Sequence, residues 1–442
     1  MVNIYKAKAK ATVQGKVLNL TIDSADYEIQ GIARYQNKIA FVAGALPTEQ
    51  VQARVTEDKA GYIKAVTVKV LQPAPERSAA VCQFASRCGG CQLQHVAVTT
   101  QQQLKQQGVD SLIRHQTGLN TLPWQPMLSA QPDGYRRRAR IGLWFDKKQR
   151  QLTVGFRQSG DKQITAISAC MVLSPVLAPV FAALNQAVVT LDDPACVTHA
   201  EVLDADGQAF VVVRHVKALS LQQQQRFIDA WPDAIWLGEA EPGQFSYWQQ
   251  TLAKPQYKLA GQGLTLEFAP DDFIQVNQRV NQMMIDQALQ WLQVNSDDVV
   301  LDLYAGMGNF TLPLAQRAKT VRAVEGVAKM VQQLTTNAEL NGLSNVVAYQ
   351  ADLHLPWPKA PWHQRDYTKV VLDPARAGAV GAVEQVVQLK PAQILYVSCN
   401  AATFARDAKV LLGGGYYLEK LAGIDMFPYT SHLEVMALFS RQ

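Results

Sequence analysis

The first seventy residues alternate short apolar runs with turn residues. Each run is three to eight residues long, and β-branched side chains are frequent in it. Many short strands at even spacing are typical of a small closed β-barrel. The pattern therefore predicts a barrel built from residues 11–13, 15–22, 31–33, 38–42, 49–55 and 65–70. Pro73, Pro75 and Arg77 follow as a predicted linker.

The next part of the chain mixes helical and strand patterns. Residues 101–115 are polar with a sparse apolar periodicity, which predicts a helix. Residues 135–145 lead into a strand, whose period of two divides the side chains between its faces: Arg136, Arg138 and Arg140 on one, and Tyr135, Arg137 and Ile141 on the other. A face of guanidinium groups suits phosphate contacts. A charged edge strand that resists aggregation is the alternative.

From residue 271 onward, apolar runs alternate with helical patterns. A predicted helix passes through Met283, Met284, Ile285 and Leu289, and predicted strands end near residues 303, 325, 349, 372 and 398. Strands that alternate with helices predict an open, mostly parallel α/β sheet. Such sheets bind ligands at the carboxyl ends of their strands. The fifth of these strands, Ile394 to Ser398, delivers the thiol of Cys399 to that edge.

Composition limits the class of protein. With 442 residues the chain suggests two or three domains, and 48% hydrophobic with 18% charged residues is typical of a globular protein. No apolar run approaches the roughly 18 residues of a membrane span. The first residues, Met1 to Lys6, show no secretory pattern, so we expect a cytoplasmic protein that is not in a membrane.

Positive charge gathers in the first third of the chain. The net charge is only +5, but residues 1–70 hold ten Lys or Arg against six Asp or Glu, and residues 101–150 hold nine against three. This asymmetry indicates a phosphate-rich partner, although a merely solvated basic face is an equal alternative.

Three cysteines lie close together in the sequence. Cys82, Cys88 and Cys91 are separated by spacers that include Gly89 and Gly90, which let the backbone fold around a shared soft metal centre. A fourth ligand must come from elsewhere. Cys170 is the natural candidate and Cys196 the second. The spacing leaves a zinc ion and an iron-sulfur cluster equally open.

A glycine-rich turn follows the first strand of the C-terminal sheet. Gly306 and Gly308 allow a ligand to approach the backbone, and a helix begins just beyond them. Glu325 ends the next strand, where an acid can hold a ribose diol. The third glycine of the dinucleotide fingerprint is absent. Instead, these strand ends, together with Asp352 and Asp373, resemble those of the class I S-adenosylmethionine methyltransferases.

Cys399 combined with Glu434 indicates which atom is methylated. Carbon 5 of a pyrimidine is a poor nucleophile until something adds at carbon 6, and a thiolate is suited to that addition. After methyl transfer, carbon 5 still bears a proton that a base must remove. Glu434 is the candidate acid-base residue, with His432 behind it. The alternative readings are a buried inert thiol and a solvated carboxylate.

The whole chain resembles the RNA uracil-5 methyltransferases, and within them the enzymes that act on 23S ribosomal RNA. The resemblance implies a multidomain α/β protein: an N-terminal OB-like TRAM β-barrel (residues 1–72), a central α+β domain with an iron-sulfur cluster and an RNA-binding surface (73–268), and a C-terminal Rossmann-like class I S-adenosylmethionine methyltransferase domain (269–442). It further implies S-adenosyl-L-methionine and a 4Fe-4S cluster as cofactors.

The same resemblance carries functional residues over by motif. The implied cluster ligands are Cys82, Cys88, Cys91 and Cys170, and the implied S-adenosylmethionine positions are Gln275, Tyr304, Asn309, Glu325, Asp352 and Asp373. Cys399 matches the nucleophile and Glu434 the base, and Phe273 could stack on an extruded base or lie in the core.

Two hypotheses remain at this point. The first is an enzyme that methylates carbon 5 of one uridine in 23S ribosomal RNA, as a monomer without an obligate protein partner. The second is a non-catalytic RNA-binding or assembly protein, or an enzyme that acts on transfer RNA. Among relatives, the transfer RNA enzymes are expected to resemble only the last two thirds of the chain and to lack the cysteine segment.

Overall fold

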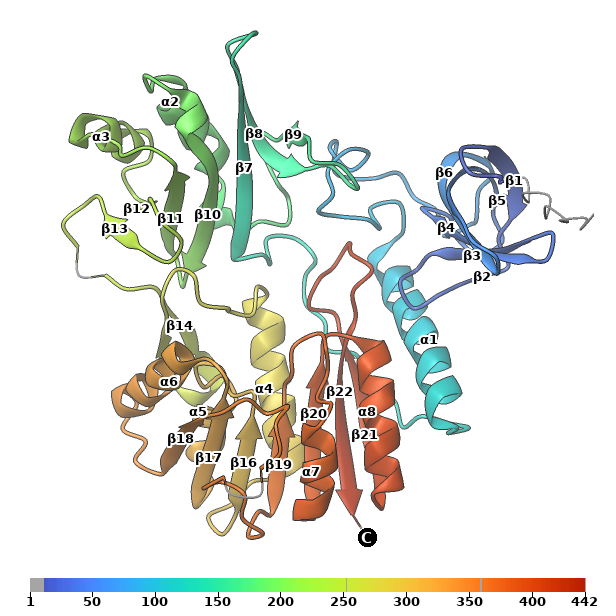
Figure 1. Ribbon diagram of the computed structural model, residues 1–442, viewed down its shortest axis with the longest axis vertical. Coiled ribbons are helices and arrows are strands. Elements are labelled where there is room, and N and C mark those ends of the chain that lie inside the picture. The colour runs from blue at the N-terminus through green and yellow to red at the C-terminus, as the bar shows by residue number, and fades with distance from the viewer. Residues whose placement is uncertain (1–11, 252, 358–359, 442) are drawn as a thin grey trace, which may run out of the picture. The chain divides into compact units, whose positions relative to one another are not determined.

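Figure 1 shows the computed structural model of the protein, which describes residues 12–251, 253–357 and 360–441. The chain divides into two compact units. One comprises residues 1–80 and 92–111, and the other residues 81–91 and 112–442. The three-domain division at residues 72 and 268 stays a prediction.

The first unit contains a six-stranded sheet in the order β1-β5-β6-β4-β3-β2. Its strands are β1 (Val17–Thr21), β2 (Ser24–Ala25), β3 (Gly31–Tyr35), β4 (Lys38–Ala43), β5 (Gln50–Asp58) and β6 (Tyr62–Gln72). The edge strands β1 and β2 follow each other directly in the chain, so the sheet returns on itself as a barrel. A barrel of this kind is what the alternating pattern predicts.

Two details of the barrel differ from the prediction. Residues 12 and 13 lie outside the strands, while Ala11 lies outside the described residues. The strand β2 was not predicted, because a two-residue strand is too short to produce an alternating pattern.

The predicted linker is held against the barrel. Arg77 bonds through Nε and Nη2 to the carboxylate of the fully buried Glu49. The helix α1 (Val98–Thr117) covers the predicted helical segment.

The second unit begins with the central sheet, a mixed seven-stranded sheet in the order β13-β12-β11-β10-β7-β8-β9. Its strands are β7 (Arg138–Asp146), β8 (Gln151–Arg157), β9 (Ile164–Ala166), β10 (Val197–Ala205), β11 (Gln208–His215), β12 (Ile235–Glu239) and β13 (Phe245–Tyr247), and its helices are α2 (Val180–Val189) and α3 (Leu221–Ala230). Along β7, Ala139, Ile141 and Leu143 are buried while Arg140 and Trp144 are exposed, as the predicted alternation requires.

A second seven-stranded sheet follows, in the order β18-β17-β16-β19-β20-β22-β21. Its strands are β16 (Val299–Leu303), β17 (Thr320–Glu325), β18 (Val346–Gln350), β19 (Lys369–Leu372), β20 (Gln393–Ser398), β21 (Tyr416–Ile424) and β22 (Glu434–Arg441). Only β22 runs antiparallel to its neighbours. The order reverses between β16 and β19, and open α/β sheets bind ligands at such a point.

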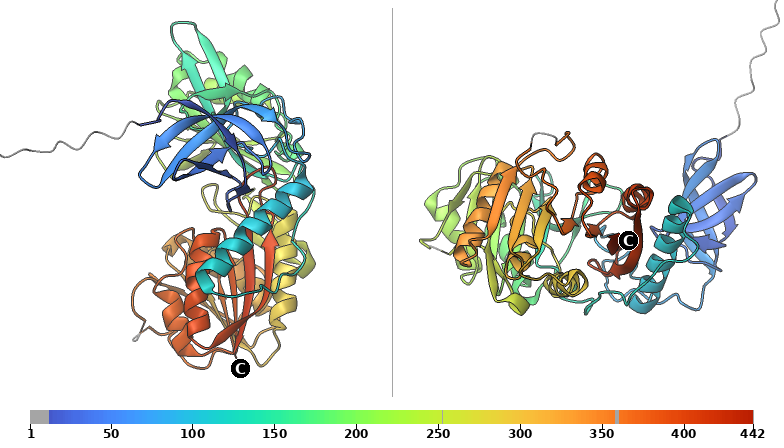
Figure 2. Two further views of the ribbon diagram at one scale, coloured as in Figure 1. Left: turned by 90° about the vertical axis from the view of Figure 1, so that its right-hand side faces the viewer. Right: turned by 90° about the horizontal axis from the view of Figure 1, so that it is seen from below.

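Helices cover both faces of this sheet. The yellow α4 (Gln278–Leu292) lies on one face, and the red α7 (Ala382–Leu389) and α8 (Ala401–Gly413) lie on the other (Figure 2). The remaining helices are the short α5 (Thr311–Ala315) and α6 (Ala328–Leu340). Three-layer packing buries the strands on both sides, which is why they read as continuous apolar runs.

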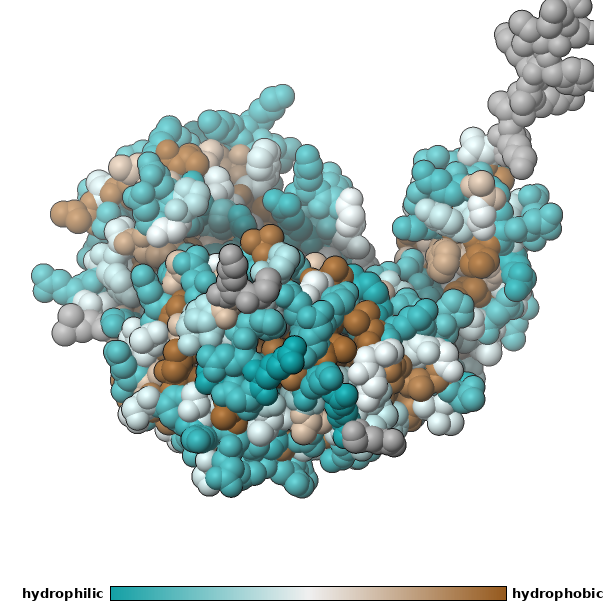
Figure 3. Space-filling view, turned by 60° about the horizontal axis from the view of Figure 1, so that its bottom comes forward, coloured by the Kyte–Doolittle hydropathy of each residue, from teal (hydrophilic) through white to brown (hydrophobic). Residues whose placement is uncertain are grey.

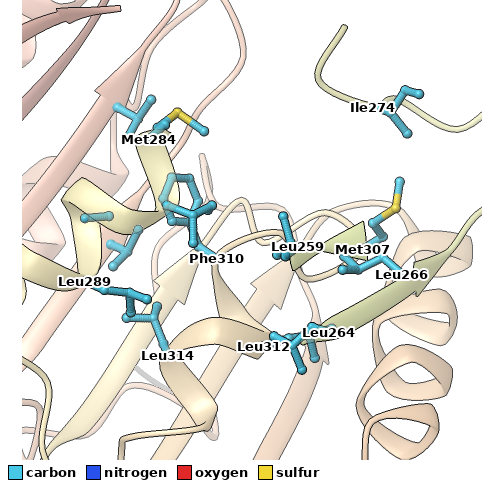
Figure 4. Close-up of a cluster of buried hydrophobic side chains, with 14 of the residues drawn as sticks. Leu259, Leu264, Leu266, Ile274, Met284, Leu289, Met307, Phe310, Leu312 and Leu314 are labelled. Atoms are coloured by element: carbon cyan, nitrogen blue, oxygen red, sulfur yellow. The ribbon is translucent and has the colours of Figure 1, made fainter. Parts of the chain in front are cut away.

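One apolar core joins the two sheets of the second unit. It includes Leu203 and Phe210 of the central sheet, α4, and the hairpin β14 (Gln256–Leu259) and β15 (Leu264–Glu267). Figure 4 shows the part of this core where the hairpin meets α4 and the turn around Phe310. Asn337 of α6 and Asn341, the residue that follows this helix, bond the backbone of β15 at 2.7–3.1 Å. The hairpin is therefore fixed to α6 by polar bonds as well as by packing.

The face drawn in Figure 3 carries mostly hydrophilic residues with scattered apolar ones. Among the helices of the described residues, none combines the length and apolar character that crossing a membrane requires.

Candidate active site

Cys399 and Glu434 face each other at the end of two neighbouring antiparallel strands. In the ladder between β20 and β22, Val397 pairs with Met436 and Ser398 with Val435. The next position in this register brings Cys399 opposite Glu434. Directly opposite residues hold their Cβ atoms about 4.5–5.5 Å apart. Residues 35 positions apart in the sequence thus share one corner of the sheet.

Burial and like charge set the proton balance of this corner. Burial, followed by the negative charge of Asp373, raises the pKa of Glu434 to about 8, against the opposing effect of Arg376. Burial also raises the pKa of Asp373 to about 7. The pKa of the Cys399 thiol is raised by burial and by both carboxylates, while Arg376 lowers it. The thiol and these two acids therefore lie within electrostatic range of one another.

The predicted cofactor residues follow successive parallel strands. Tyr304, Glu325, Asp352 and Asp373 lie at or just beyond the carboxyl ends of β16, β17, β18 and β19. The fold thus gathers four of the six positions along one edge of the sheet. The remaining two, Gln275 and Asn309, lie outside the strands.

The loop after β16 is held in an unusual backbone conformation. Tyr304 has φ 63°, and Gly306 and Gly308 have φ 54° and 106°. Glu325 fixes the loop, because its carboxylate accepts the N–H of Gly306 at 3.0 Å and that of Val327 at 2.9 Å. Its remaining lone pairs are still available to a ligand. The Tyr304 hydroxyl is buried without a hydrogen-bond partner among the described residues, which is costly unless a ligand supplies one.

Asn309 lies in an amide network. Its Oδ1 accepts hydrogen bonds from the Tyr257 hydroxyl and from Asn281, both at 3.0 Å, and its Nδ2 donates to Asn281 at 2.9 Å. These contacts leave one N–H of Asn309 for a ligand.

Gln275 belongs to a tethered segment before α4. Its carbonyl accepts from Nε of the buried Arg137 at 2.8 Å. Asn277 caps α4 through the Val280 N–H at 3.2 Å and donates to the Met426 carbonyl. The side chain of Phe273, by contrast, is 73% exposed, which excludes the core reading of that residue.

None of the six cysteines, which all lie within the described residues, forms a disulfide. Burial and the neighbouring Cys170 and Cys82 raise the pKa of Cys88, and burial and Cys82 raise that of Cys170, so these three thiols lie within electrostatic range of one another. Cys91 contributes to the raised pKa values of Tyr135 and Tyr429. No group of three or more His, Cys, Asp or Glu side chains within residues 12–251, 253–357 and 360–441 is arranged to hold a metal ion. The alternative ligand, Cys196, is buried in the central core.

Three residues of the site escaped the sequence analysis. Asp302 lies inside β16, where burial, with Asp373 and Glu325, raises its pKa to about 7 against a 2.5 Å hydrogen bond from Thr311. An acid within a buried strand was a usable signal for this residue, because burying a lone carboxyl is costly. Asn281 gave no local signal, since its partner Asn309 is distant in sequence, and Arg376 lies three residues after Asp373 but was not assigned a role.

Two family models match the chain. The model described as tRNA (Uracil-5-)-methyltransferase matches residues 237–351 and 362–442, and the TRAM domain model matches residues 11–68. The N-terminal barrel is therefore a TRAM domain, and the C-terminal sheet carries the methyltransferase fold.

Full-length relatives are more specific. A protein of Photorhabdus laumondii subsp. laumondii named 23S rRNA (uracil(1939)-C(5))-methyltransferase RlmD is 42% identical over 444 residues, which is 100% of both chains. A protein of the same name from Pectobacterium atrosepticum is 41% identical and covers 99% of this chain and 98% of its own length.

A solved structure shares the fold. The Pyrococcus abyssi tRNA (uracil-54, C5)-methyltransferase in complex with S-adenosyl-L-homocysteine has a TM-score of 0.71 at 20% identity, and covers 96% of this chain and 100% of its own. The expectation that transfer RNA enzymes share only the last two thirds of the chain is wrong for this enzyme. Fold coverage does not separate the two RNA classes, whereas the full-length identity does. The chain belongs to the RlmD family of 23S rRNA (uracil-C5)-methyltransferases.

Proposed function

We propose that the protein transfers a methyl group from S-adenosylmethionine to carbon 5 of the uridine at the 1939-type site of 23S ribosomal RNA, with Cys399 as nucleophile and Glu434 as base. The observation that carries this assignment is the pairing of β20 with β22, which sets the thiol opposite the buried carboxyl beside Asp373.

The proposed chemistry follows from these positions. Cys399 gives its proton to a carboxylate of the site, and its sulfur adds to carbon 6 of the uracil. The resulting enolate attacks the methyl carbon of the sulfonium, and S-adenosylhomocysteine leaves. Glu434 as carboxylate takes the proton from carbon 5. The carbon 5–carbon 6 double bond then re-forms, and the C–S bond to Cys399 breaks.

The cofactor position rests on the loop after β16 and on the acids at the strand ends. Gln275, Tyr304, Asn309, Glu325, Asp352 and Asp373 are proposed to hold S-adenosylmethionine. A cluster of carboxyls suits its sulfonium and ammonium charges. The free N–H of Asn309 and the unpartnered hydroxyl of Tyr304 are polar groups that a bound cofactor would satisfy.

A 4Fe-4S cluster held by Cys82, Cys88, Cys91 and Cys170 is part of the proposal. Four thiols and no carboxylate form the donor set that such clusters require. The mutual electrostatic effects of Cys82, Cys88 and Cys170 support it. The N–H groups of Val172 and Leu173, which lower the pKa of Cys170, are suited to stabilise a bound thiolate. When bound, the cluster supplies covalent crosslinks between segments distant in sequence.

Phe273 and the TRAM barrel are proposed to contact the RNA. The exposed ring of Phe273 adjoins the segment that carries Gln275, so it can stack on a base next to the extruded uridine. We infer a monomeric cytoplasmic protein without an obligate protein partner, because methyl transfer to RNA as described uses residues of one chain.

Mapping of 5-methyluridine by mass spectrometry in ribosomal and transfer RNA tests the assignment. Cells that carry Cys399→Ala should lack 5-methyluridine at the 1939-type position of 23S rRNA, whereas cells that carry Cys196→Ala should keep it. Unchanged methylation in the Cys399→Ala strain would exclude the nucleophile and favour a non-catalytic RNA-binding protein. Loss of the modification in transfer RNA instead would contradict the substrate.

A further inference from the structure

The central sheet carries an open groove of about 1160 Å³ on the exposed face of β7 and β8. Its floor contains Gly142, which pairs with Gly155 of β8 and His199 of β10, so no side chain rises from the middle of β7. A Cβ at Gly142 would come within 2.7 Å of Ile164, which forms the apolar side of the groove. The groove is larger than most pockets for small ligands, which hold about 300–1,000 Å³. It therefore suits a segment of a polymer.

The groove is strongly basic. Arg140, Lys147, Lys148, Arg157 and Lys162 line it, against the single acid Asp146. The Asp146 carboxylate is already engaged, because it accepts the backbone N–H groups of two turn residues at 2.8 and 3.0 Å.

Two arginines of neighbouring strands line the groove together. Arg140 of β7 and Arg157 of β8 both border it, and both lower the pKa of the nearby His199. Like charges gathered in one place repel each other. The nearest acid, Glu201, is 3.7 Å from Arg140 and also 3.9 Å from Arg138, so one carboxylate serves two guanidinium groups. An anion bound in the groove would relieve this excess of positive charge.

His199 lies in the same positive field as these arginines. Burial, and then Arg140, lower the pKa of His199 to about 4; Glu239 opposes this shift, and Arg214 and Arg157 add smaller lowering effects. The ring is therefore neutral at physiological pH, and its Nδ1 lies 3.2 Å from Arg140. The same Nδ1 lies 3.0 Å from the Thr198 hydroxyl, and the uncharged ring lines the groove.

An aromatic ring completes the groove. Trp144 follows Arg140 and Gly142 on the same face of β7, and its side chain is 65% exposed. Nothing in the fold requires so large an apolar group in water. Exposed aromatic rings beside cationic side chains are the usual means of binding single-stranded nucleic acid, because every base offers a face for stacking.

We propose that this groove binds a single-stranded segment of the substrate RNA next to the target uridine, with one base stacked on Trp144 and its phosphates held by the surrounding cations. This inference rests on the RNA methyltransferase function proposed above and adds a second recognition site to it.

The position of β7 supports this path for the RNA. At its first residue, Arg138 donates a hydrogen bond to the carbonyl of Asp272, beside the exposed Phe273. Trp144 lies six residues further along the strand, which is about 20 Å at the rise of an extended strand. The strand thus leads from the segment at the candidate active site to the groove. RNA that leaves the candidate active site can reach the groove along Arg138 and Arg140 of β7.

The test compares variants on a fragment of 23S rRNA that contains the target uridine and both flanks. With Trp144→Ala we expect the Kd measured by fluorescence anisotropy to rise roughly 5- to 100-fold, the effect of losing one stacked base. The loss in methylation should fall on KM rather than on kcat. A triple variant, Lys147→Ser, Lys148→Ser and Lys162→Ser, should reduce the slope of log K against log salt by about 2, at about 0.7 per phosphate contact.

Matched controls separate the groove from general effects. Tyr247→Ala removes an exposed aromatic ring from β13, at the far edge of the same sheet, and should leave the Kd unchanged. A triple variant of exposed lysines elsewhere, Lys258→Ser, Lys319→Ser and Lys409→Ser, controls for net charge. Circular dichroism and thermal unfolding should match the wild type for all variants, because every replaced side chain is exposed.

Truncated RNA decides the outcome. When the 5′ or the 3′ flank is removed, one of the two truncations should lower the wild-type affinity to that of Trp144→Ala. The proposal is overturned if Trp144→Ala binds the full fragment like Tyr247→Ala, or if neither truncation changes the wild-type affinity. The proposal is also overturned if the groove variants bind RNA like the wild type but no longer bind an acidic protein, since the groove would then be a protein-binding site. If the groove variants weaken binding but the wild type methylates no RNA, the proposed function fails and the groove stands.

Discussion

Replacing Glu434 by glutamine should stabilise the protein at alkaline pH while it blocks turnover. The glutamine amide has nearly the shape of a protonated carboxyl but cannot ionise. Glu434 is buried, and its pKa is raised to about 8 by burial and by Asp373. In the wild type, ionisation of this group is therefore opposed by the fold, and the variant removes that cost.

The magnitude follows from proton linkage. A carboxyl whose pKa is raised in the folded state contributes stability below its unfolded pKa of 4.5, and this contribution is lost as the pH rises through the folded pKa of about 8. A shift of about 3.5 units corresponds to about 5 kcal/mol, of which about 4 kcal/mol is lost between pH 5 and pH 9. The free energy of unfolding of Glu434→Gln relative to the wild type should therefore rise by that amount over this interval. For a domain of 150–250 residues this corresponds to a shift in Tm of roughly 10 °C.

Two assays follow the two consequences. Thermal unfolding at pH 5, 7 and 9 compares the wild type, Glu434→Gln and the control Glu339→Gln, in which the replaced side chain is exposed on α6. In parallel, a denaturing gel follows labelled RNA incubated with S-adenosylmethionine. Glu434→Gln should methylate carbon 5 once and remain covalently attached to the RNA through Cys399, because no base removes the proton.

The reasoning is refuted if the Tm difference between Glu434→Gln and the wild type is the same at pH 5 and pH 9. It is also refuted if the wild type loses no more stability toward pH 9 than the variant does. Full turnover by the variant, without a denaturant-resistant adduct, would remove Glu434 from the mechanism even if the stability result held.

Three further predictions follow from the same region and from the cysteines. Binding of S-adenosylmethionine should release protons, because its positive charge favours the ionised forms of Asp302 and Asp373, whose pKa values are about 7. Below pH 7 the affinity should therefore rise by up to about tenfold per pH unit for each carboxyl that loses its proton on binding. Calorimetry in buffers of different ionisation enthalpy measures the number of protons released. Tyr304→Phe should stabilise the free protein by about 1 kcal/mol, because it removes a buried unpartnered hydroxyl, and a simultaneous loss of cofactor affinity in equilibrium dialysis would show that the hydroxyl binds the cofactor. Cys88→Ser should lower the iron content and the Tm of purified protein, whereas Cys196→Ser should leave the iron content unchanged.

The carboxyl ends of the parallel strands were predictable from the sequence, because they depend on local patterns. The runs that end at Leu303, Glu325 and Leu372 are mostly apolar, so their pattern predicts both the strands and their ends. The alternation of β7 was predictable for the same reason. The barrel strands were predictable as a group, but not the short β2.

Pairings between distant segments could not be predicted in this way. The sequence offers Cys399 and Glu434 as separate candidates, and only the insertion of β22 between β20 and β21 brings them together. The same holds for the amide pair of Asn309 and Asn281 and for the effect of Arg376 on the thiol. Each of these contacts depends on tertiary structure, which leaves no periodic signal in the sequence.

The backbone around the cysteines gives the proposed cluster a role outside methyl transfer. The N–H of Gly89 donates to the carbonyl of Arg157 at 2.9 Å, and the N–H of Ser159 contacts the carbonyl of Arg87 at 3.4 Å. A Cβ at Gly89 would lie 3.0 Å from that Arg157 carbonyl, so the two segments approach as closely as glycine permits. Arg157 is a cation of the basic groove at the end of β8. A metal centre that fixes the thiols would therefore also fix one side of the groove, and removal of iron should weaken RNA binding before it affects cofactor binding.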